Sequence, residues 1–334
     1  MDNANFIIWI NELTKGQGDI VGKKCANLGE LSKAGFRVPS GFALTLKAYD
    51  EFMNKTGLSK KIRDHLKTFT ADPQDPQDIP KFKALSRSIR EIVESETLPE
   101  EIDHLVTRYY KDLCEKTGIE EVSVATRSAG PVSHPGQYET YLHIKGLSDV
   151  KAHILKVWGS TFNTRSLIAR ARKGLSLDYD PIGVAVIEMV NARAAGIMFT
   201  ACPNTADKSK IFIEGNWGLG ESVVGGNVNP DSWVVDKYSS QILDSKASVK
   251  ERECRLDPET GRVSVCEVSS DRQKVFCLTD EEVIKLARLG TEIEKHFFVA
   301  QDIEWAVSEE PTRDLFVLQT RPEKFNITIR ISGF

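Results

Sequence analysis

The chain lacks long hydrophobic runs and lacks an excess of charge of one sign. Its only apolar run near the N-terminus is FIIWI (6–10), which is far too short for a signal sequence or a membrane span. The 334 residues carry a net charge of −4 and contain no basic run, so the composition favours neither nucleic acid nor an anionic membrane as a partner. Apolar residues make up 40% and charged residues 28%, an ordinary balance that argues against general disorder. We therefore expect a globular protein of two domains or one large two-lobed unit.

The chain also lacks paired cysteines. Its six cysteines are scattered, and none forms a C-x-x-C pair. This spacing argues against a zinc site or a disulfide framework and favours reduced thiols in a cytoplasmic protein.

Two familiar nucleotide-binding motifs are absent as well. The segment GQGDIVGKKC (16–25) resembles a Walker loop, but Gln17 takes the place of its first glycine and Lys24 that of its Ser or Thr. The segment EGNWGLGESVVGGNVNPDSW (214–233) is rich in glycine, yet Val223 stands at the sixth position of G-x-G-x-x-G. A P-loop is excluded, and a dinucleotide fold of the dehydrogenase type is disfavoured.

The predicted secondary structure changes near residue 120. Helix formers with glycine or proline stops predict helices before it, and β-branched or aromatic runs predict mostly strands after it. Three prolines in FTADPQDPQDIP (69–80) predict an exposed loop. A cap at Thr279 and first-turn acids predict an amphipathic helix ending near Phe297. Expected helices also cover 23–35, 46–70, 80–117, 148–158 and 163–173, and expected strands are EEVSVATRS, QYETYLHI, GVAVIEMV, AGIMFT, KIFIEG, SWVVDKY, QILDSKASVK, QDIEWAV and DLFVLQTR.

Polar residues on the last two expected strands suggest a phosphate and metal site. Alternation on paired strands places Glu304 and Gln319 on one face, with Arg321 two residues beyond Gln319. Magnesium prefers hard oxygen ligands, and arginine matches phosphate in a bidentate fork. The alternative is an edge strand with solvated polar residues.

A second candidate is TRSAGPVSHPGQYET (126–140), a strand followed by a loop rich in Gly, Pro and Ser. Such a loop can place backbone N–H groups over phosphates, with Arg127 adding positive charge. The alternative is a long hairpin loop without a ligand.

Together these segments resemble one family. DIVGKKCANLGELSKAGFRVPSGFALT, TRSAGPVSHPGQYET, AAGIMFT, WGLGESVVGGNVNPD, EIEKHF…QDIEWAV and LFVLQTRPE are similar to the N-terminal nucleotide-binding domain of phosphoenolpyruvate synthase, pyruvate phosphate dikinase and their relatives. The resemblance implies an α+β, two-lobed, ATP-grasp-like fold with lobes at 1–180 and 181–326 and a tail at 327–334.

The resemblance also implies roles for individual residues. Lys24 becomes the phosphate lysine, presented from a helix start, while Lys23 stands where the family usually has Gly. MgATP is expected between the lobes, with backbone groups of the linking strand on adenine. The remaining implied roles are phosphate binding for Arg127, Arg321 and Arg165, the glycine-rich loop for Gly136, Gln137 and Thr140, adenine contact for Glu188, Met189 and Val190, and magnesium ligation for Glu304 and Gln319.

The chain departs from the family pattern at a few positions. Ile187 replaces a usual Gln before the adenine segment, which puts base selectivity in doubt, and Phe298 and Ala300 replace a usual Gly and Pro. The loop SAGPVSHPG is closer in length to the dikinase version than to the synthase version.

Full-length relatives pass phosphate from ATP to a histidine on a separate swivelling domain, with AMP and phosphate as products in the synthase branch. None of the six histidines here has that sequence context, including His134 in the loop and His296 on a helix. We therefore expect a partner chain or further domain that carries the histidine and binds the small-molecule acceptor.

Three interpretations of the function stay open. The ending ITIRISGF favours a separate gene product, and the arrangement resembles the small subunit of phenylphosphate synthase, so phenol is the acceptor we expect. The first alternative is the ATP-binding domain of a pyruvate,water dikinase. The second is an ATP-sensing module without catalysis, which the joint presence of Lys24, Arg127, Glu304, Gln319 and Arg321 disfavours.

Overall fold

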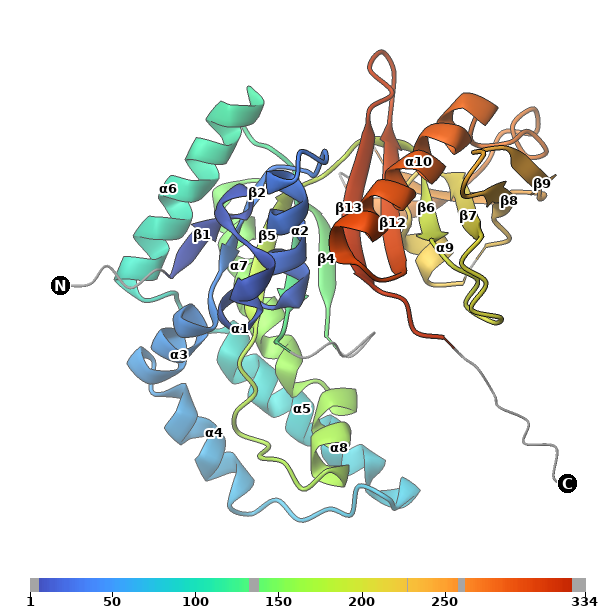
Figure 1. Cartoon of the computed structure of the whole chain (residues 1–334). Coiled ribbons are helices and arrows are strands. Elements are labelled where there is room, and N and C mark those ends of the chain that lie inside the picture. The colour runs from blue at the N-terminus through green and yellow to red at the C-terminus, as the bar shows by residue number, and fades with distance from the viewer. Residues whose placement is uncertain (1–5, 132–137, 227, 258–261, 326–334) are drawn as a thin grey trace, which may run out of the picture. The chain divides into compact units, whose positions relative to one another are not determined.

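The structure, a computed structural model, describes residues 6–131, 138–226, 228–257 and 262–325 (Figure 1). The described residues form two compact units. The first contains the described residues up to Lys33 together with Ser40–Met189, and the second contains Ala34–Pro39 and the described residues from Val190 onward. The chain thus passes between units at 189/190, whereas the sequence placed the boundary near 180, and the short segment Ala34–Pro39 groups with the second unit.

The first unit is built on a five-stranded sheet in the order β1-β2-β5-β3-β4, in which every neighbouring pair is antiparallel. Its strands are β1 (Ile7–Trp9), β2 (Gly41–Leu44), β3 (Val124–Ala129), β4 (Thr140–Ile144) and β5 (Gly183–Glu188). Its α-helices are α1 (Gly18–Val21), α2 (Lys23–Lys33), α3 (Leu46–Lys55), α4 (Leu58–Leu66), α5 (Ile79–Glu94), α6 (Glu100–Thr117), α7 (Leu147–Gly159) and α8 (Thr164–Arg172). Its short 3-10 turns are η1 (Ile10–Glu12), η2 (Lys15–Gln17), η3 (Pro76–Asp78) and η4 (Ser160–Phe162).

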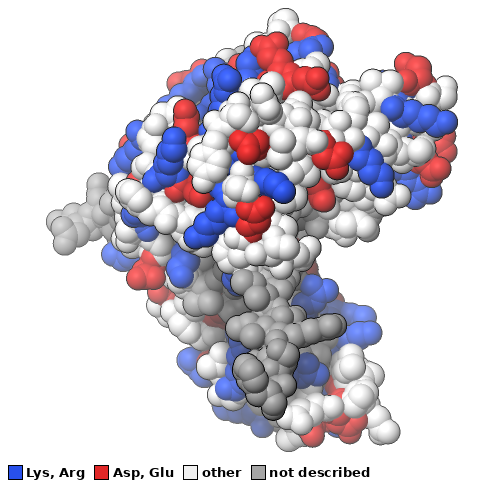
Figure 2. All heavy atoms as spheres, turned by 45° about the vertical axis from the view of Figure 1, so that its right-hand side comes forward, with Lys and Arg blue, Asp and Glu red and all other residues white. Residues whose placement is uncertain are grey.

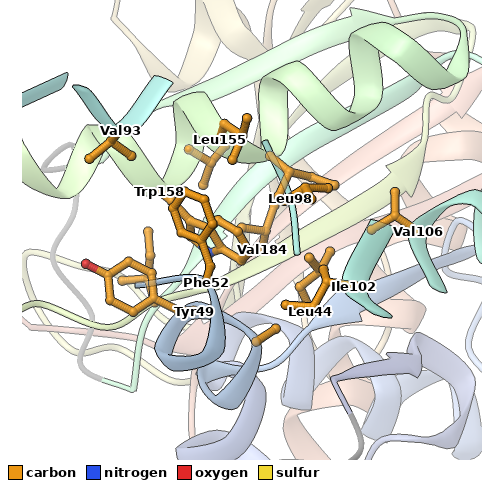
Figure 3. Packing of buried hydrophobic residues seen from close by; sticks show 14 of the residues in the cluster. Leu44, Tyr49, Phe52, Val93, Leu98, Ile102, Val106, Leu155, Trp158 and Val184 are labelled. Carbon is orange, nitrogen blue, oxygen red and sulfur yellow. The ribbon is translucent and has the colours of Figure 1, made fainter. Parts of the chain in front are cut away.

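Aromatic packing fixes the core of this unit. Trp158 of α7 stacks on Phe52 of α3 with ring centroids 4.8 Å apart, and it meets Tyr49 edge-on at 6.0 Å. Figure 3 shows these rings pointing toward one another beside Leu44 and Val184 of the sheet. Such buried aromatic pairs hold the helices against the strands at fixed positions.

Helix α5 begins earlier than the sequence predicted. The segment 69–80 was expected to be an exposed loop throughout, but Pro76 lies in η3 and Pro80 in the first turn of α5. The first turn of a helix tolerates proline, because the missing N–H would have no intrahelical partner there. The apolar residues Phe82, Leu85 and Ile89 then recur at helical spacing and are buried.

The second unit is built on a six-stranded antiparallel sheet in the order β13-β12-β6-β7-β8-β9, beside the separate pair β10-β11. One face of the larger sheet is covered by α10, whose Gly290 lies against Met198 of β6. The elements are β6 (Ala192–Phe199), β7 (Lys210–Trp217), α9 (Glu221–Val224), β8 (Asp231–Asp236), β9 (Ile242–Lys246), β10 (Arg252–Leu256), β11 (Val263–Glu267), α10 (Asp280–Phe297), β12 (Gln301–Ser308) and β13 (Leu315–Pro322).

The cap of α10 confirms the sequence prediction. The Thr279 hydroxyl accepts a hydrogen bond from the Glu282 N–H, and the Glu282 carboxylate accepts one from the Thr279 N–H. This capping box satisfies two N–H groups at the helix start. The helix ends where Phe298 adopts a left-handed conformation with φ of 61°.

Two surface properties agree with the composition of the chain. Figure 2 shows Lys and Arg side chains intermingled with Asp and Glu over one face of the molecule, in keeping with the net charge of −4. Within the described residues, no helix is long and apolar enough to cross a membrane.

Candidate functional site

Lys24 lies in the first turn of α2, as the sequence predicted, and β3 anchors that turn. The Lys23 N–H donates to the Gly130 carbonyl at 3.1 Å, immediately after β3 ends. Gly22 precedes the helix with φ of 84°, and a Cβ there would lie 2.3 Å from the Ala129 carbonyl carbon and oxygen. The close approach of these two backbones therefore fixes the backbone position from which the Lys24 side chain extends.

Arg127 lies on β3 and shares a face of the sheet with Thr140. Arg127 pairs with Thr140 on β4 and with Ala185 on β5, and directly paired residues point to the same side. Both Lys24 and Arg127 act electrostatically on the buried thiol of Cys25. These two predicted phosphate-binding residues therefore lie in the same region of the first unit. Burial outweighs both cations and raises the pKa of Cys25 to about 12, which keeps this thiol protonated and unreactive.

The start of β4 is tied to α5 on the opposite face of the sheet. Arg90 forms a bidentate pair with Glu139, with N–O distances of 2.6 and 2.9 Å. The Tyr141 hydroxyl also donates to Glu139, and the Glu139 N–H donates to the Ser160 hydroxyl. These bonds fix the chain directly before Thr140. The predicted loop residues Gly136 and Gln137 lie outside the described residues.

The other predicted residues of the first unit occupy two further places. Arg165 is the second residue of α8 and is exposed, and its role toward the triphosphate stays a prediction. Glu188 ends β5, and burial raises the pKa of its carboxyl group. The N–H groups of Glu188 and Met189 donate to the carbonyls of Ser40 and Ser123, so an adenine contact through either would have to replace a hydrogen bond. Val190 is the first residue of the second unit after this passage.

In the second unit, strand register brings the predicted metal and phosphate residues together. Glu304 of β12 pairs directly with Gln319 of β13, and the Gln319 amide donates to the Glu304 carboxylate at 2.8 Å. Arg321 pairs with Asp302 two residues along, and its Nε and Nη2 lie 2.7 and 2.6 Å from the same Asp302 oxygen. The predicted face for Glu304, Gln319 and Arg321 is therefore confirmed, and it is the face opposite α10.

Asp302 belongs to this face but was not predicted from the sequence. Its alternation with Glu304 was the available signal, because residues two apart on a strand point to the same side. Burial raises the pKa of the Asp302 carboxyl group, while the Arg321 guanidinium acts in the opposite direction. The adjacent Glu323 is affected more strongly: burial and the charge of Asp302 raise its pKa to about 7, against the opposing effect of Arg321.

Glu214 was missed as well. Ile197 of β6 pairs with Glu304 on one side and with Glu214 of β7 on the other, so both carboxylates lie on one face of the sheet. Glu214 is half-buried, and burial raises its pKa. The face thus carries three carboxylates, one amide and one guanidinium.

The Glu304 and Gln319 pair fits the chemistry of magnesium. A carboxylate and an amide side by side offer hard oxygen ligands, and magnesium in phosphate enzymes commonly takes one or two protein ligands and completes its shell with water and substrate phosphate. Among the described residues, no group of three or more His, Cys, Asp or Glu side chains could hold a metal ion by itself. A two-ligand site that depends on a bound phosphate agrees with both observations.

An α+β fold that presents a lysine at a helix start and an acid–amide–arginine face on a sheet suits a nucleotide-binding domain, and the family match gives its class. The chain matches the family described as pyruvate phosphate dikinase, AMP/ATP-binding domain, over residues 18–329. It belongs to this family, and the family assigns it ATP as ligand.

Similar proteins carry one recurring name. The chain is 38% identical over 347 residues to a probable phosphoenolpyruvate synthase of Staphylothermus marinus, with 95% of this chain and 41% of that protein covered. It is 36% identical over 327 residues to a probable phosphoenolpyruvate synthase of Methanocaldococcus jannaschii, covering 96% and 27%. It is 35% identical over 355 residues to the phosphoenolpyruvate synthase of Pyrococcus furiosus, covering 95% and 43%. The chain therefore spans less than half the length of these relatives.

Proposed function

We propose that the chain is the ATP-binding part of a phosphoenolpyruvate synthase, or pyruvate,water dikinase, and phosphorylates a histidine carried by a partner chain or a further domain. The observation that carries the proposal is the pair of cross-strand contacts, Glu304 with Gln319 and Asp302 with Arg321, in a chain of the dikinase family. This face offers oxygen ligands and a guanidinium within two residues of each other, as a metal-bound triphosphate requires.

Each residue has a defined task in this proposal. Lys24 and Arg127 of the first unit and Arg321 of the second bind the phosphates of one ATP molecule in an ATP-grasp-like manner. Magnesium bound by Glu304 and Gln319 would neutralise charge that develops on the transferring phosphoryl group. Phosphoryl transfer asks mainly for positioning and charge neutralisation, so these side chains supply what the step needs without forming a covalent bond to phosphate.

The covered share of the relatives supports a division of labour. The three relatives named above extend well beyond the region that this chain matches. We assign the phosphorylated histidine and the acceptor site to that further region. In the first half-reaction, we expect ATP to be converted to AMP and phosphate.

Pyruvate is better supported as the acceptor than phenol, which the sequence alone led us to expect. The three relatives named above are phosphoenolpyruvate synthases by name. Phenol as acceptor rests only on the resemblance to a split subunit. A direct comparison uses the chain together with its histidine-bearing partner: AMP release that depends on pyruvate supports this assignment, and release that depends on phenol would restore the other.

The site itself is tested by phosphate transfer from ATP labelled at the β-phosphate. We expect Lys24→Gln and Arg321→Gln each to lower histidine labelling by about 100-fold, the loss typical of removing one stabilising group from a transition state. Lys23→Gln changes an exposed lysine next to Lys24 and is the matched control. Full labelling by both site variants would overturn the assignment. Tight ATP binding without any labelling in the reconstituted complex would favour a sensing module instead.

A further inference from the structure

The first unit contains a hollow beside α5, away from Lys24 and Arg127. It has a volume of about 500 Å³, within the range of small-ligand sites, and it lies between α5 and the start of α8. Its lining consists of Lys83, Ser86, Arg87, Arg90, Glu91, Glu94 and Thr164. The six residues of α5 recur at helical spacing, so the hollow lies along one polar stripe of that helix.

The hollow lies on the other side of the sheet from Arg127, although Thr164 in its lining directly precedes Arg165, which the resemblance assigns to the triphosphate. Arg127 and Thr140 are directly paired and share a face, whereas Tyr141, one residue along, points to the opposite face, and its hydroxyl donates to Glu139. On that opposite face Glu139 binds Arg90, which lines the hollow. A ligand in the hollow is therefore separate from the region of Lys24 and Arg127.

The charges of the hollow are only partly compensated by the protein. Arg90 is neutralised, because it binds both Glu94 and Glu139. Lys83 and Arg87 lie one turn apart on α5, and neither forms an ion pair or hydrogen bond with a side chain that the structure describes. Both side chains are exposed and can meet an anion, while Glu91 lies four residues beyond Arg87 on the same stripe.

Two further groups point to a ligand with phosphate chemistry. Ser86 is only 6% exposed, and its hydroxyl has no hydrogen-bond partner among the described residues although it lines the hollow. Thr164 is the first residue of α8, where N–H groups lack intrahelical partners and the helix dipole favours anions. Asn163 caps this helix by accepting from the Ser166 N–H, which leaves the Thr164 N–H to other acceptors.

We propose that this hollow is a binding site for a small phosphate monoester. Lys83 and Arg87 would bind the phosphate oxygens, with the Ser86 hydroxyl and the Thr164 N–H as additional donors. The Glu91 carboxylate also lines the hollow and would repel a bare dianion, so it selects a ligand that carries a hydroxyl or amino group to donate to it. Because Arg90 connects the hollow to Glu139, an occupied site acts on the strand that carries Thr140.

The test is a titration of the intact chain with inorganic phosphate and with glycerol 3-phosphate at constant ionic strength, followed by amide NMR. We expect saturable shifts of the Thr164 amide and tighter binding of glycerol 3-phosphate than of phosphate. Arg87→Gln should weaken both by about tenfold, as expected for loss of one charge-assisted hydrogen bond at an accessible site. Ser86→Ala removes one neutral hydroxyl donor and should weaken both less.

Two control variants separate binding in the hollow from binding elsewhere on the chain. Lys111→Gln removes an exposed lysine on α6 and should leave the affinity unchanged, as should Lys24→Gln in the nucleotide region. The proposal fails if the Thr164 amide does not respond, if Arg87→Gln binds as the wild type does, or if Lys24→Gln abolishes the response. Equal affinity for phosphate and glycerol 3-phosphate would overturn the role of Glu91.

Discussion

At the scale of single residues, Asp302 holds the side chain of Arg321, which we propose binds phosphate, in one position. The Arg321 side chain is 44% exposed, yet its Nε and Nη2 are held by the carboxylate of the largely buried Asp302. A long side chain fixed in this way loses less conformational entropy when it binds a ligand. The remaining N–H groups of the guanidinium can then meet phosphate from a fixed direction.

Glu323 makes the stability of this region depend on pH. Its carboxyl group has a pKa of about 7, well above its ordinary value of 4.5, because it is partly buried near Asp302 and only partly compensated by Arg321. Between about pH 4.5 and 7 the unfolded chain has released this proton and the folded chain has not, so stability falls as pH rises. We expect Glu323→Gln to remove this contribution. The melting temperature of the variant relative to the wild type should therefore increase as the pH rises across that window.

The control variant, Glu281→Gln, should change stability with pH in the opposite direction. Lys285 lowers the pKa of Glu281 on α10, so Glu281 contributes stability once pH rises above its folded pKa. Glu281→Gln should therefore lose stability relative to the wild type as the pH rises from the folded pKa to the ordinary value of 4.5, with no further change above it. A difference between Glu323→Gln and wild type that stays flat from pH 4.5 to 7 would contradict the role given to Glu323.

At the scale of elements, the junction of α2 with β3 links backbone geometry to the position of Lys24. Gly22 has φ of 84° and ψ of 148°, a region that only glycine adopts readily, and it packs against the backbone of Ala129. The helix start is consequently set by contact between two main chains, without a side chain in between.

Gly22→Ala should therefore affect both stability and ATP binding. The new Cβ meets main-chain atoms that cannot move independently, so we expect a loss of at least about 1–3 kcal/mol in the free energy of unfolding. The displaced helix start should weaken ATP binding by about tenfold, which calorimetry would measure. Gly35→Ala is the matched control, because Gly35 has φ of 86° but nothing within 4 Å of its Cβ. It should destabilise less and leave ATP affinity unchanged, and equal effects of both variants on ATP binding would contradict this role of Gly22.

Periodicity predicted the long elements of this fold but not the short ones. The pattern after Thr279 predicted α10 with its capping box, and alternation on β12 and β13 predicted the shared face of Glu304 and Gln319. Strands β1 and β2 have three and four residues, too few to show a period of two, and they were not predicted from the sequence. Strands β10 and β11, which form a separate two-stranded sheet, were not predicted from the sequence either.

Long-range contacts account for what was missed at the candidate site. Alternation on β12 places Asp302 beside Glu304, but only the cross-strand register shows that it binds Arg321. The position of Glu214 depends on Ile197 of β6 lying between it and Glu304, a relation between three strands that no local pattern contains. The contact of Arg90 with Glu139 joins residues 49 apart.

At the scale of the whole molecule, the proposed function distributes one ligand over two compact units. Lys24 and Arg127 belong to the first unit, and Glu304, Gln319 and Arg321 belong to the second. If one ATP molecule binds to both groups, its binding free energy stabilises the folded chain only when both units contribute. This gives the proposal a consequence that does not require the histidine-bearing partner.

We expect MgATP at about 100 times its dissociation constant to raise the free energy of unfolding by about 2.7 kcal/mol. Lys24→Gln and Arg321→Gln should each remove most of this stabilisation at the same ATP concentration, and the double variant should lose little more, because either change alone already prevents tight binding. Lys23→Gln should retain it. Thermal denaturation with and without MgATP measures the effect. Stabilisation that survives Arg321→Gln but not Lys24→Gln would place ATP on the first unit alone, and stabilisation by ATP that persists in excess EDTA would argue against Glu304 and Gln319 as magnesium ligands.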